Sequence, residues 1–195
     1  MPEFTAAFAL KVAAAFLMGS IPFAVVTMWG TGIDITKYGS GNPGFNNVLR
    51  YSKWRSALCL AGDVLKGIAP MWLFAGDEVT GWTMGMAAVL GHCFSPFLGF
   101  NGGKGIATSA GVMLYLYPRI LLPCVGLYIL LRLVGGKLQW TERGTVASLT
   151  ASAAFVVLLV VSQSGRMAML GFALLVFVAW RHKANFQRLA GARSR

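Results

Sequence analysis

Charged residues, and acidic ones above all, are scarce in this chain of 195 residues. Only 12% of the residues are charged, and six Asp and Glu stand against 17 Lys and Arg. Since a soluble domain carries about a quarter charged residues, this composition excludes an ordinary soluble fold. The hydrophobic share of 56% and the mean hydropathy of +0.65 indicate an integral membrane protein. Cytoplasmic loops and anionic lipid headgroups then account for the net charge of +11 without nucleic acid.

Cysteine and histidine are also rare, with three and two residues. Cys59, Cys93 and Cys124 lie in apolar surroundings without paired spacing, which predicts packing residues and neither a disulfide nor a metal site. The acidic residues are scattered, so we expect no metal and no cofactor. No carboxylate is evident beside His92 or His182 to orient the ring, and this argues against a Ser-His-Asp triad.

Long hydrophobic runs make up most of the chain, and a helix needs about 20 apolar residues to cross a bilayer. Pro118 and Arg119 interrupt one run near its middle and predict a break into two spans. The runs are 4–29, 54–75, 82–100, 106–134, 146–162 and 167–180. The sequence therefore predicts an all-α integral membrane protein with seven transmembrane helices in one domain, residues 1–195.

Basic residues are divided unequally between the two sides of this seven-span arrangement. Thirteen lie in or beside 29–53, 101–105, 132–145 and the tail from residue 181, whereas the opposite loops hold only Arg119 and Arg166. A continuous helix through Pro118 would remove this asymmetry. Because basic loops stay in the cytoplasm, we expect an extracytoplasmic N-terminus and a cytoplasmic C-terminus.

The predicted cytoplasmic side carries two polar segments in the first half of the chain. Segment 19–22 on its own is read as a proline kink with a helix-packing serine. Segment 38–50 offers glycine N–H groups, hydroxyl and amide donors and one arginine, with no carboxylate after Asp34. This set suits an oxyanion better than a solvated loop. The candidate binding residues here are Gly39, Ser40, Gly41, Asn42, Gly44, Asn47 and Arg50.

A third segment begins at His92 and contains the turn Gly102-Gly103-Lys104-Gly105, followed by Thr108 near a predicted helix start. Glycines let the backbone approach a ligand, and a lysine and a helix N-terminus favour an anion. A tight interhelical turn with a lysine reaching the interface is the alternative. The candidate phosphate-binding residues are Gly102, Gly103, Lys104, Gly105 and Thr108.

A fourth segment combines Thr145 and Ser148 at the start of one span with His182 and Asn185 after the last one. His182 and Asn185 share a face if the helix continues through residue 181. A contact between His182 and lipid headgroups is equally open. Within a span, Asp63 and Lys66 are three apart and are expected to pair, with Asp63 as a supporting residue for the site.

In their order along the chain, these segments resemble the bacterial acyl-phosphate:glycerol-3-phosphate acyltransferases, the PlsY family. The matching segments are GSIPF (19–23), GSGNPG (39–44), NVLR (47–50), GDVLKG (62–67), GH (91–92), PFLGF (96–100), GGKGIAT (102–108) and RHKAN (181–185). They cover nearly the whole chain. The family's seven spans, with the N-terminus outside, agree with the topology expected from charge.

The resemblance implies transfer of a fatty acyl group from acyl phosphate to the 1-hydroxyl of glycerol 3-phosphate, giving lysophosphatidate and phosphate. It also implies a multi-pass bacterial inner or plasma membrane protein, monomeric or in contact with other lipid-synthesis enzymes, with its active site facing the cytoplasm. Ser40, Arg50, Lys104, His182 and Asn185 would hold substrate phosphates and polar groups. The candidate catalytic residues are His92, Lys104, Thr145, Ser148 and His182, where either Thr145 or Ser148 supplies the family's hydroxyl.

Three positions depart from the family pattern. Phe45 and Asn46 replace the usual Ala and Thr of Gly-Ala-Thr-Asn, and Asn101 stands where a lysine is frequent. They leave open an altered substrate preference or a weakly active paralogue. A non-enzymatic carrier of anions or lipid phosphates on the same bundle is the second hypothesis, although no inverted repeat is apparent.

Overall fold

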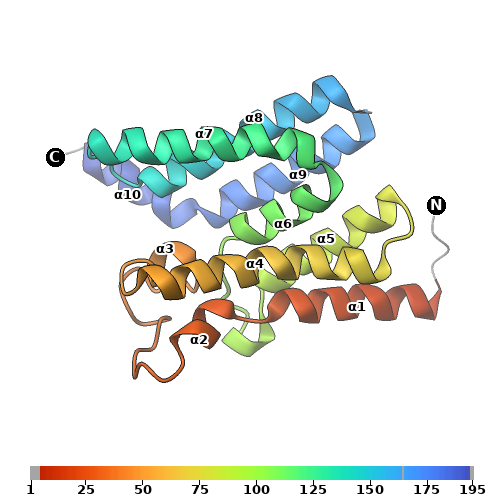
Figure 1. Cartoon of the computed structure of the whole chain (residues 1–195), viewed down its shortest axis with the longest axis horizontal. Helices are drawn as coiled ribbons and strands as arrows, with labels where there is room; N and C mark the ends of the chain where they lie inside the picture. Colours follow the sequence, from red (N-terminus) through yellow and green to blue (C-terminus); the bar gives the residue numbers. More distant parts are fainter. Residues whose placement is uncertain (1–4, 164, 194–195) are drawn as a thin grey trace. The chain divides into compact units, whose positions relative to one another are not determined.

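The computed structural model describes residues 5–163 and 165–193, and its regular elements within these ranges are all helical (Figure 1). The chain forms two compact units, one ending at Leu116 and the other beginning at Tyr117. The first unit contains α1 (Ala6–Ser20), α2 (Phe23–Met28), α3 (Phe45–Val48), α4 (Lys53–Phe74), α5 (Glu78–Cys93), η1 (Pro96–Leu98) and α6 (Ile106–Leu116). The second contains α7 (Pro118–Lys137), α8 (Arg143–Ser162), α9 (Gly165–Arg181) and α10 (Lys183–Arg193).

Helix α5 packs against α1 and α4, and α4 also packs against α6, so these four helices form the body of the first unit. Glycines allow the closest contact, between α1 and α5. A Cβ atom at Gly91 would lie 2.0 Å from the carbonyl oxygen of Phe16, and one at Gly19 would lie 2.1 Å from that of Ala88. This is the close backbone approach by which small residues hold membrane helices together.

Pro22 separates α1 from α2, in agreement with the proline kink expected in segment 19–22. Ser20 donates its hydroxyl to the carbonyl of Phe16, and Ser95, after α5, donates to the carbonyl of Ser20 at 2.7 Å. The carbonyl of Ile21 accepts the Lys66 ammonium at 2.7 Å. Partners from other elements thus satisfy the backbone groups that the proline break exposes.

The second unit begins at the predicted break, because α6 ends at Leu116 and Pro118 occupies the first position of α7. Proline is favoured there, since its missing N–H has no partner in the first turn. Helix α8 packs between α7 and α9, and the rings of Tyr117 and Phe155 lie 6.2 Å apart.

The shared face considered for His182 and Asn185 requires a continuous helix, but α9 ends at Arg181 and α10 begins at Lys183. Helices α9 and α10 are bent by 56° at a break, at His182. The ring of His182 bonds the carbonyl of Val178 through Nδ1. In a continuing helix this carbonyl would accept the backbone N–H of His182, but that N–H donates to the carbonyl of Ala179 instead. Such competition from a side chain ends a helix.

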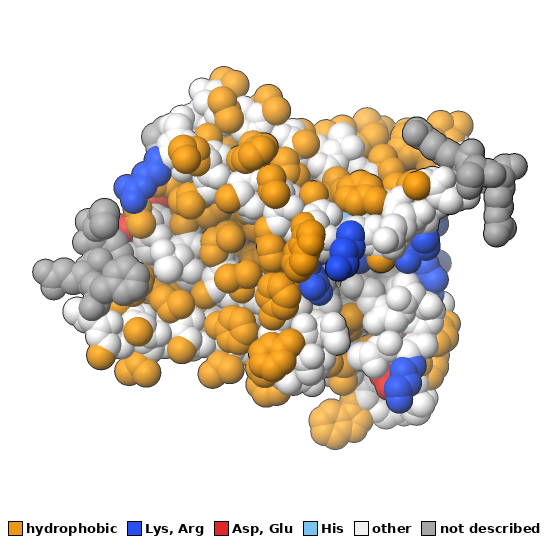
Figure 2. Space-filling view, turned by 180° about the vertical axis from the view of Figure 1, so that it is seen from behind, with side chains coloured by type: hydrophobic (Ala, Val, Ile, Leu, Met, Phe, Trp, Pro, Cys, Tyr) orange, Lys and Arg blue, Asp and Glu red, His pale blue; other side chains and the backbone are white. Residues whose placement is uncertain are grey.

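Within the described residues, four segments are long and apolar enough to cross a membrane, namely 6–28, 53–74, 118–137 and 143–162, and the bent pair α9 and α10 would be a fifth. Helix α6 is shorter, with 11 residues. The run expected at 82–100 is wrong at its end, because α5 stops at Cys93 and a 3-10 turn follows. Large hydrophobic side chains such as Leu10, Trp29 and Trp72 are exposed, and Figure 2 shows hydrophobic groups over much of one face, as lipid contact requires.

Candidate active site

The loop 38–50 is shaped from within by the buried side chain of Asn47. Its amide nitrogen donates to the carbonyls of Ile35 and Tyr38 at 3.0 and 2.8 Å, and its oxygen accepts the N–H of Ser40 at 3.0 Å. Gly39 has a φ of +57°, and a Cβ there would lie 2.5 Å from the Asn47 oxygen. The described bonds therefore place Asn47 inside the loop as its organiser, while the side chains of Ser40 and Arg50 remain exposed at its surface.

The other residues of this loop that were predicted to bind phosphate, Gly41, Asn42 and Gly44, are less exposed than Ser40 and Arg50. Gly41 has a φ of +69°, Asn42 is half-buried and its N–H lies 3.5 Å from the Ser40 hydroxyl, and Gly44 is buried before α3. Phosphate binding by this loop stays a prediction, and the exposed cation and hydroxyl of Arg50 and Ser40 are the groups best placed for it.

The glycine-lysine turn is anchored to the end of α5. The N–H groups of Gly102 and Gly103 donate to the carbonyls of Cys93 and His92, each at 3.1 Å. These two N–H groups therefore hold the turn in place, in contrast to the expectation that they face a phosphate. The φ of +86° at Gly105 then turns the chain into α6, whose first turn contains the Gly105–Ser109 hydrogen bond.

Lys104, at the tip of this turn, is half-buried, whereas Thr108 is fully buried. Thr108 faces α4, since a Cβ at Gly67 would lie 2.3 Å from the Thr108 carbonyl oxygen. Its hydroxyl has no hydrogen-bond partner among the described residues. Lys104 is accordingly the better candidate of the two for contact with a substrate.

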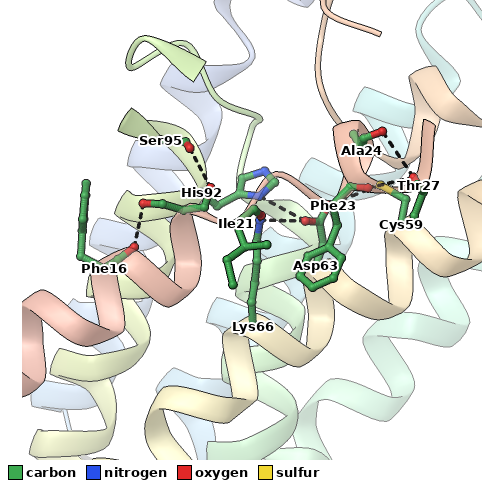
Figure 3. A network of polar contacts seen from close by, with 11 residues as sticks. Phe16, Ile21, Phe23, Ala24, Thr27, Cys59, Asp63, Lys66, His92 and Ser95 are labelled. Carbon is green, nitrogen blue, oxygen red and sulfur yellow. Dashed lines mark hydrogen bonds and ion pairs between the residues drawn. The ribbon is translucent and has the colours of Figure 1, made fainter. Parts of the chain in front are cut away.

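A buried polar network lies between α4, α5 and the α1–α2 break (Figure 3). The Lys66 ammonium lies 2.8 Å from Oδ1 of Asp63, which confirms the predicted pairing, and Nδ1 of His92 lies 3.5 Å from the same oxygen. The expectation that His92 has no carboxylate beside it is therefore wrong. Asp63 and His92 are 29 positions apart, so only the packing of α4 against α5 could reveal this partner.

The second unit gathers its polar residues around Glu142, at the start of α8. Its carboxylate accepts hydrogen bonds from the amide of Asn185 and the guanidinium of Arg188, both on α10, and from the Thr145 hydroxyl at 3.2 Å. Burial opposes ionisation of Glu142, but the hydrogen bonds from Arg188 and Asn185 outweigh it and lower the pKa of this carboxyl. One carboxylate thus joins Asn185 and Thr145, two predicted site residues.

Sequence reasoning missed Glu142, because no carboxylate was evident beside His182 and its neighbour Asn185. Thr145 is three positions from Glu142, but the partners on α10 follow 43 and 46 positions later, where no local pattern connects them to Glu142. Arg188 balances the negative charge that Glu142 brings to this cluster.

His182 and Ser148 are both buried in the second unit. The carbonyl of Val178 lies 2.8 Å from Nδ1 of His182 and can only accept, so Nδ1 is the donor in this hydrogen bond. The Ser148 hydroxyl donates to the Thr145 carbonyl at 3.2 Å. These bonds orient both side chains, and they leave open which hydroxyl, Thr145 or Ser148, serves a substrate.

Comparison with known proteins identifies the family to which this chain belongs. A family model described as glycerol-3-phosphate acyltransferase matches residues 9–192. Curated proteins named glycerol-3-phosphate acyltransferase include one from Pseudomonas aeruginosa (strain UCBPP-PA14), 38% identical over 188 residues, with 93% of this chain and 95% of the relative covered. One from Sinorhizobium medicae (strain WSM419) is 40% identical over 189 residues, with 92% and 88% covered.

A solved structure gives the same result for the fold. The chain is similar to the crystal structure of PlsY (YgiH), an integral membrane glycerol 3-phosphate acyltransferase, in its glycerol 3-phosphate form, with a TM-score of 0.83 and 31% identity over 96% of this chain and 94% of that one. The protein is an all-helical integral membrane protein. It belongs to the glycerol-3-phosphate acyltransferase family, as the ordered segments of the sequence predicted.

Proposed function

We propose that this protein transfers a fatty acyl group from acyl phosphate to the 1-hydroxyl of glycerol 3-phosphate, producing lysophosphatidate and inorganic phosphate. The observation that carries the proposal is the similarity, over nearly the whole chain, to an acyltransferase crystallised in glycerol 3-phosphate and lysophosphatidic acid forms. Two phosphate-bearing substrates also suit a chain whose site residues include Arg50 and Lys104 in the first unit and an amide-imidazole group in the second.

The chemistry requires little beyond alignment and charge stabilisation, because a carboxylic-phosphoric anhydride is already activated. The glycerol oxygen bonds to the acyl carbon, the bond from that carbon to the phosphate oxygen breaks, and the leaving phosphate takes the hydroxyl proton. Arg50, Ser40 and Lys104 hold phosphate groups during this exchange, while His182 and Asn185 hold polar groups of the substrates. No acyl-enzyme forms in this scheme.

Lys104 and Arg50 give the first test. Purified protein is incubated with palmitoyl phosphate and glycerol 3-phosphate, and phosphate and lysophosphatidate are measured. We expect both products from the wild type and at least a 100-fold loss of kcat/KM in Lys104→Ala and Arg50→Ala, because a charge-assisted phosphate contact contributes about 3 kcal/mol.

Lys37→Ala is the matched control, since Lys37 is an exposed lysine of the same unit whose ion pair with Asp34 is local. Its kinetic constants should stay within about twofold of the wild type. Well-folded wild-type protein that releases neither product would contradict the acyltransferase proposal and favour a carrier of anions or lipid phosphates.

A further inference from the structure

The buried polar network of Asp63, Lys66 and His92 has no role in the direct attack of glycerol 3-phosphate on acyl phosphate. It nevertheless adjoins the Gly102–Lys104 turn, because His92 contacts Gly103. We propose that Asp63 is a positioning residue that acts through His92 and Lys66 to set the place of the Gly102–Lys104 turn; this inference rests on the proposed function. It does so by holding two adjoining backbone segments, the end of α5 and the α1–α2 break.

The first step of the argument is electrostatic. Asp63 and Lys66 form an ion pair at 2.8 Å with both side chains almost fully buried, in a helix long enough to span a membrane. Ionised groups in such a place are unfavourable unless each has partners, and they persist in membrane helices mainly where they serve the site. The ammonium of Lys66 is shared between Asp63 and the carbonyl of Ile21, so the pair also fixes the chain at the α1–α2 break.

The second step concerns His92, whose two ring edges face different groups. Nδ1 lies 3.5 Å from the Asp63 carboxylate. The opposite nitrogen, Nε2, faces the backbone of Gly103, where a Cβ atom would lie 2.1 Å from it and where the three nearest atoms all belong to the His92 ring. The ring therefore fills the space between the carboxylate and the turn. This position supports the turn and leaves little room for a substrate hydroxyl at Nε2.

The third step connects the ring to the backbone hydrogen bonds of the turn. The carbonyl of His92 accepts the N–H of Gly103, and the next carbonyl, that of Cys93, accepts the N–H of Gly102. The residue whose ring contacts Asp63 is thus the residue whose backbone holds the turn. Lys104 follows directly, so displacement of the His92 ring is transmitted to the side chain that we propose binds phosphate.

The experiment uses the full-length protein in lipid nanodiscs. The main variant is the double substitution Asp63→Asn with Lys66→Met, which removes both charges and so avoids an unpaired buried ammonium. We expect this variant to fold, with a melting temperature within a few degrees of the wild type. Its KM for at least one phosphate-bearing substrate should nevertheless rise at least tenfold, with a smaller change in kcat. Ser56→Ala, at a buried polar residue of the same helix outside the cluster, should leave both constants unchanged.

A second comparison tests the contact between His92 and the turn without requiring activity. Gly103→Ala should lower the melting temperature, because its Cβ strikes the ring, and adding His92→Ala should recover part of that loss by making room. If the two substitutions are additive in melting temperature, the ring does not support the turn. If the folded double variant of Asp63 and Lys66 has a wild-type KM, Asp63 merely balances Lys66. Either result overturns the inference, whereas wild-type protein without activity contradicts the proposed acyltransferase and leaves the melting comparison to decide the packing.

Discussion

At the scale of single residues, one side-chain amide and two carboxylates organise the described parts of the proposed site. Asn47, Asp63 and Glu142 each accept or donate several hydrogen bonds or ion pairs, and each brings together residues from separate positions in the chain. The exposed Arg50 and Ser40 and the half-buried Lys104 belong to segments that these residues support. The groups proposed to touch substrate and the groups that place them are therefore distinct.

Glu142 provides a residue-scale prediction with a defined pH dependence. Its hydrogen bonds lower its folded pKa below the ordinary value of 4.5, so the unfolded state binds the proton more readily. The stabilisation is therefore complete above about pH 4.5 and is lost as the pH falls through the lower folded value. Since Glu142 and Arg188 are partly exposed, we expect Glu142→Gln to reduce stability by only about 1 kcal/mol at pH 7.

Thermal unfolding of both proteins between pH 7 and pH 3 measures this effect. The difference between wild type and Glu142→Gln should shrink as the solution becomes more acidic. Glu78→Gln, at an exposed acidic residue in the first turn of α5, is the control. A difference that grows toward low pH would show that the carboxylate of Glu142 is not held in its ionised form.

At the scale of helices, the contact between α1 and α5 depends on glycines, which have no side chain to keep the two backbones apart. Gly91→Ala would place a Cβ 2.0 Å from a backbone oxygen of α1, which cannot move aside as a flexible side chain could. We expect a loss of stability of about 3 kcal/mol, at the upper end of overpacking effects, or failure to fold. Melting temperature and yield of monodisperse protein measure it.

Gly126→Ala on α7 is the matched control, because nothing lies within 4 Å of its added Cβ. Alanine there should be neutral or stabilising by up to about 1 kcal/mol, since glycine is the poorer helix former. Equal destabilisation by both substitutions would contradict the close packing of α1 on α5.

At the scale of the whole molecule, we propose that the chain crosses the membrane seven times, with its N-terminus outside and the proposed site facing the cytoplasm. The distribution of basic residues supports this arrangement. Helix α6, with 11 residues, is about 17 Å long, well below the roughly 30 Å of a bilayer core. A span built on α6 can therefore cross the membrane only if the bilayer is thinner there or if the preceding glycine turn adds to the length of the span.

Cysteine labelling with a membrane-impermeant maleimide tests the topology. All three native cysteines are buried and should react slowly. Gln139→Cys should be labelled only in inverted vesicles, from the cytoplasmic side, and Gly76→Cys only in intact spheroplasts. Labelling of both from the same side would exclude seven spans with a break at Pro118.

What the sequence alone determined depends on composition and on neighbours along the chain. The membrane class, the helical fold, the break before Pro118 and the Asp63–Lys66 pair all follow from hydropathy, proline geometry or a spacing of three on one helix. The ordered segments also identified the family. Only the tertiary structure decided that Asp63 faces His92, that Glu142 joins Thr145 to Asn185, and that α9 bends into α10 at His182. The first two contacts join residues 29 and 43 positions apart, so helix packing decides them. The bend depends on whether the ring of His182 or its backbone N–H bonds the Val178 carbonyl, which sequence spacing does not determine.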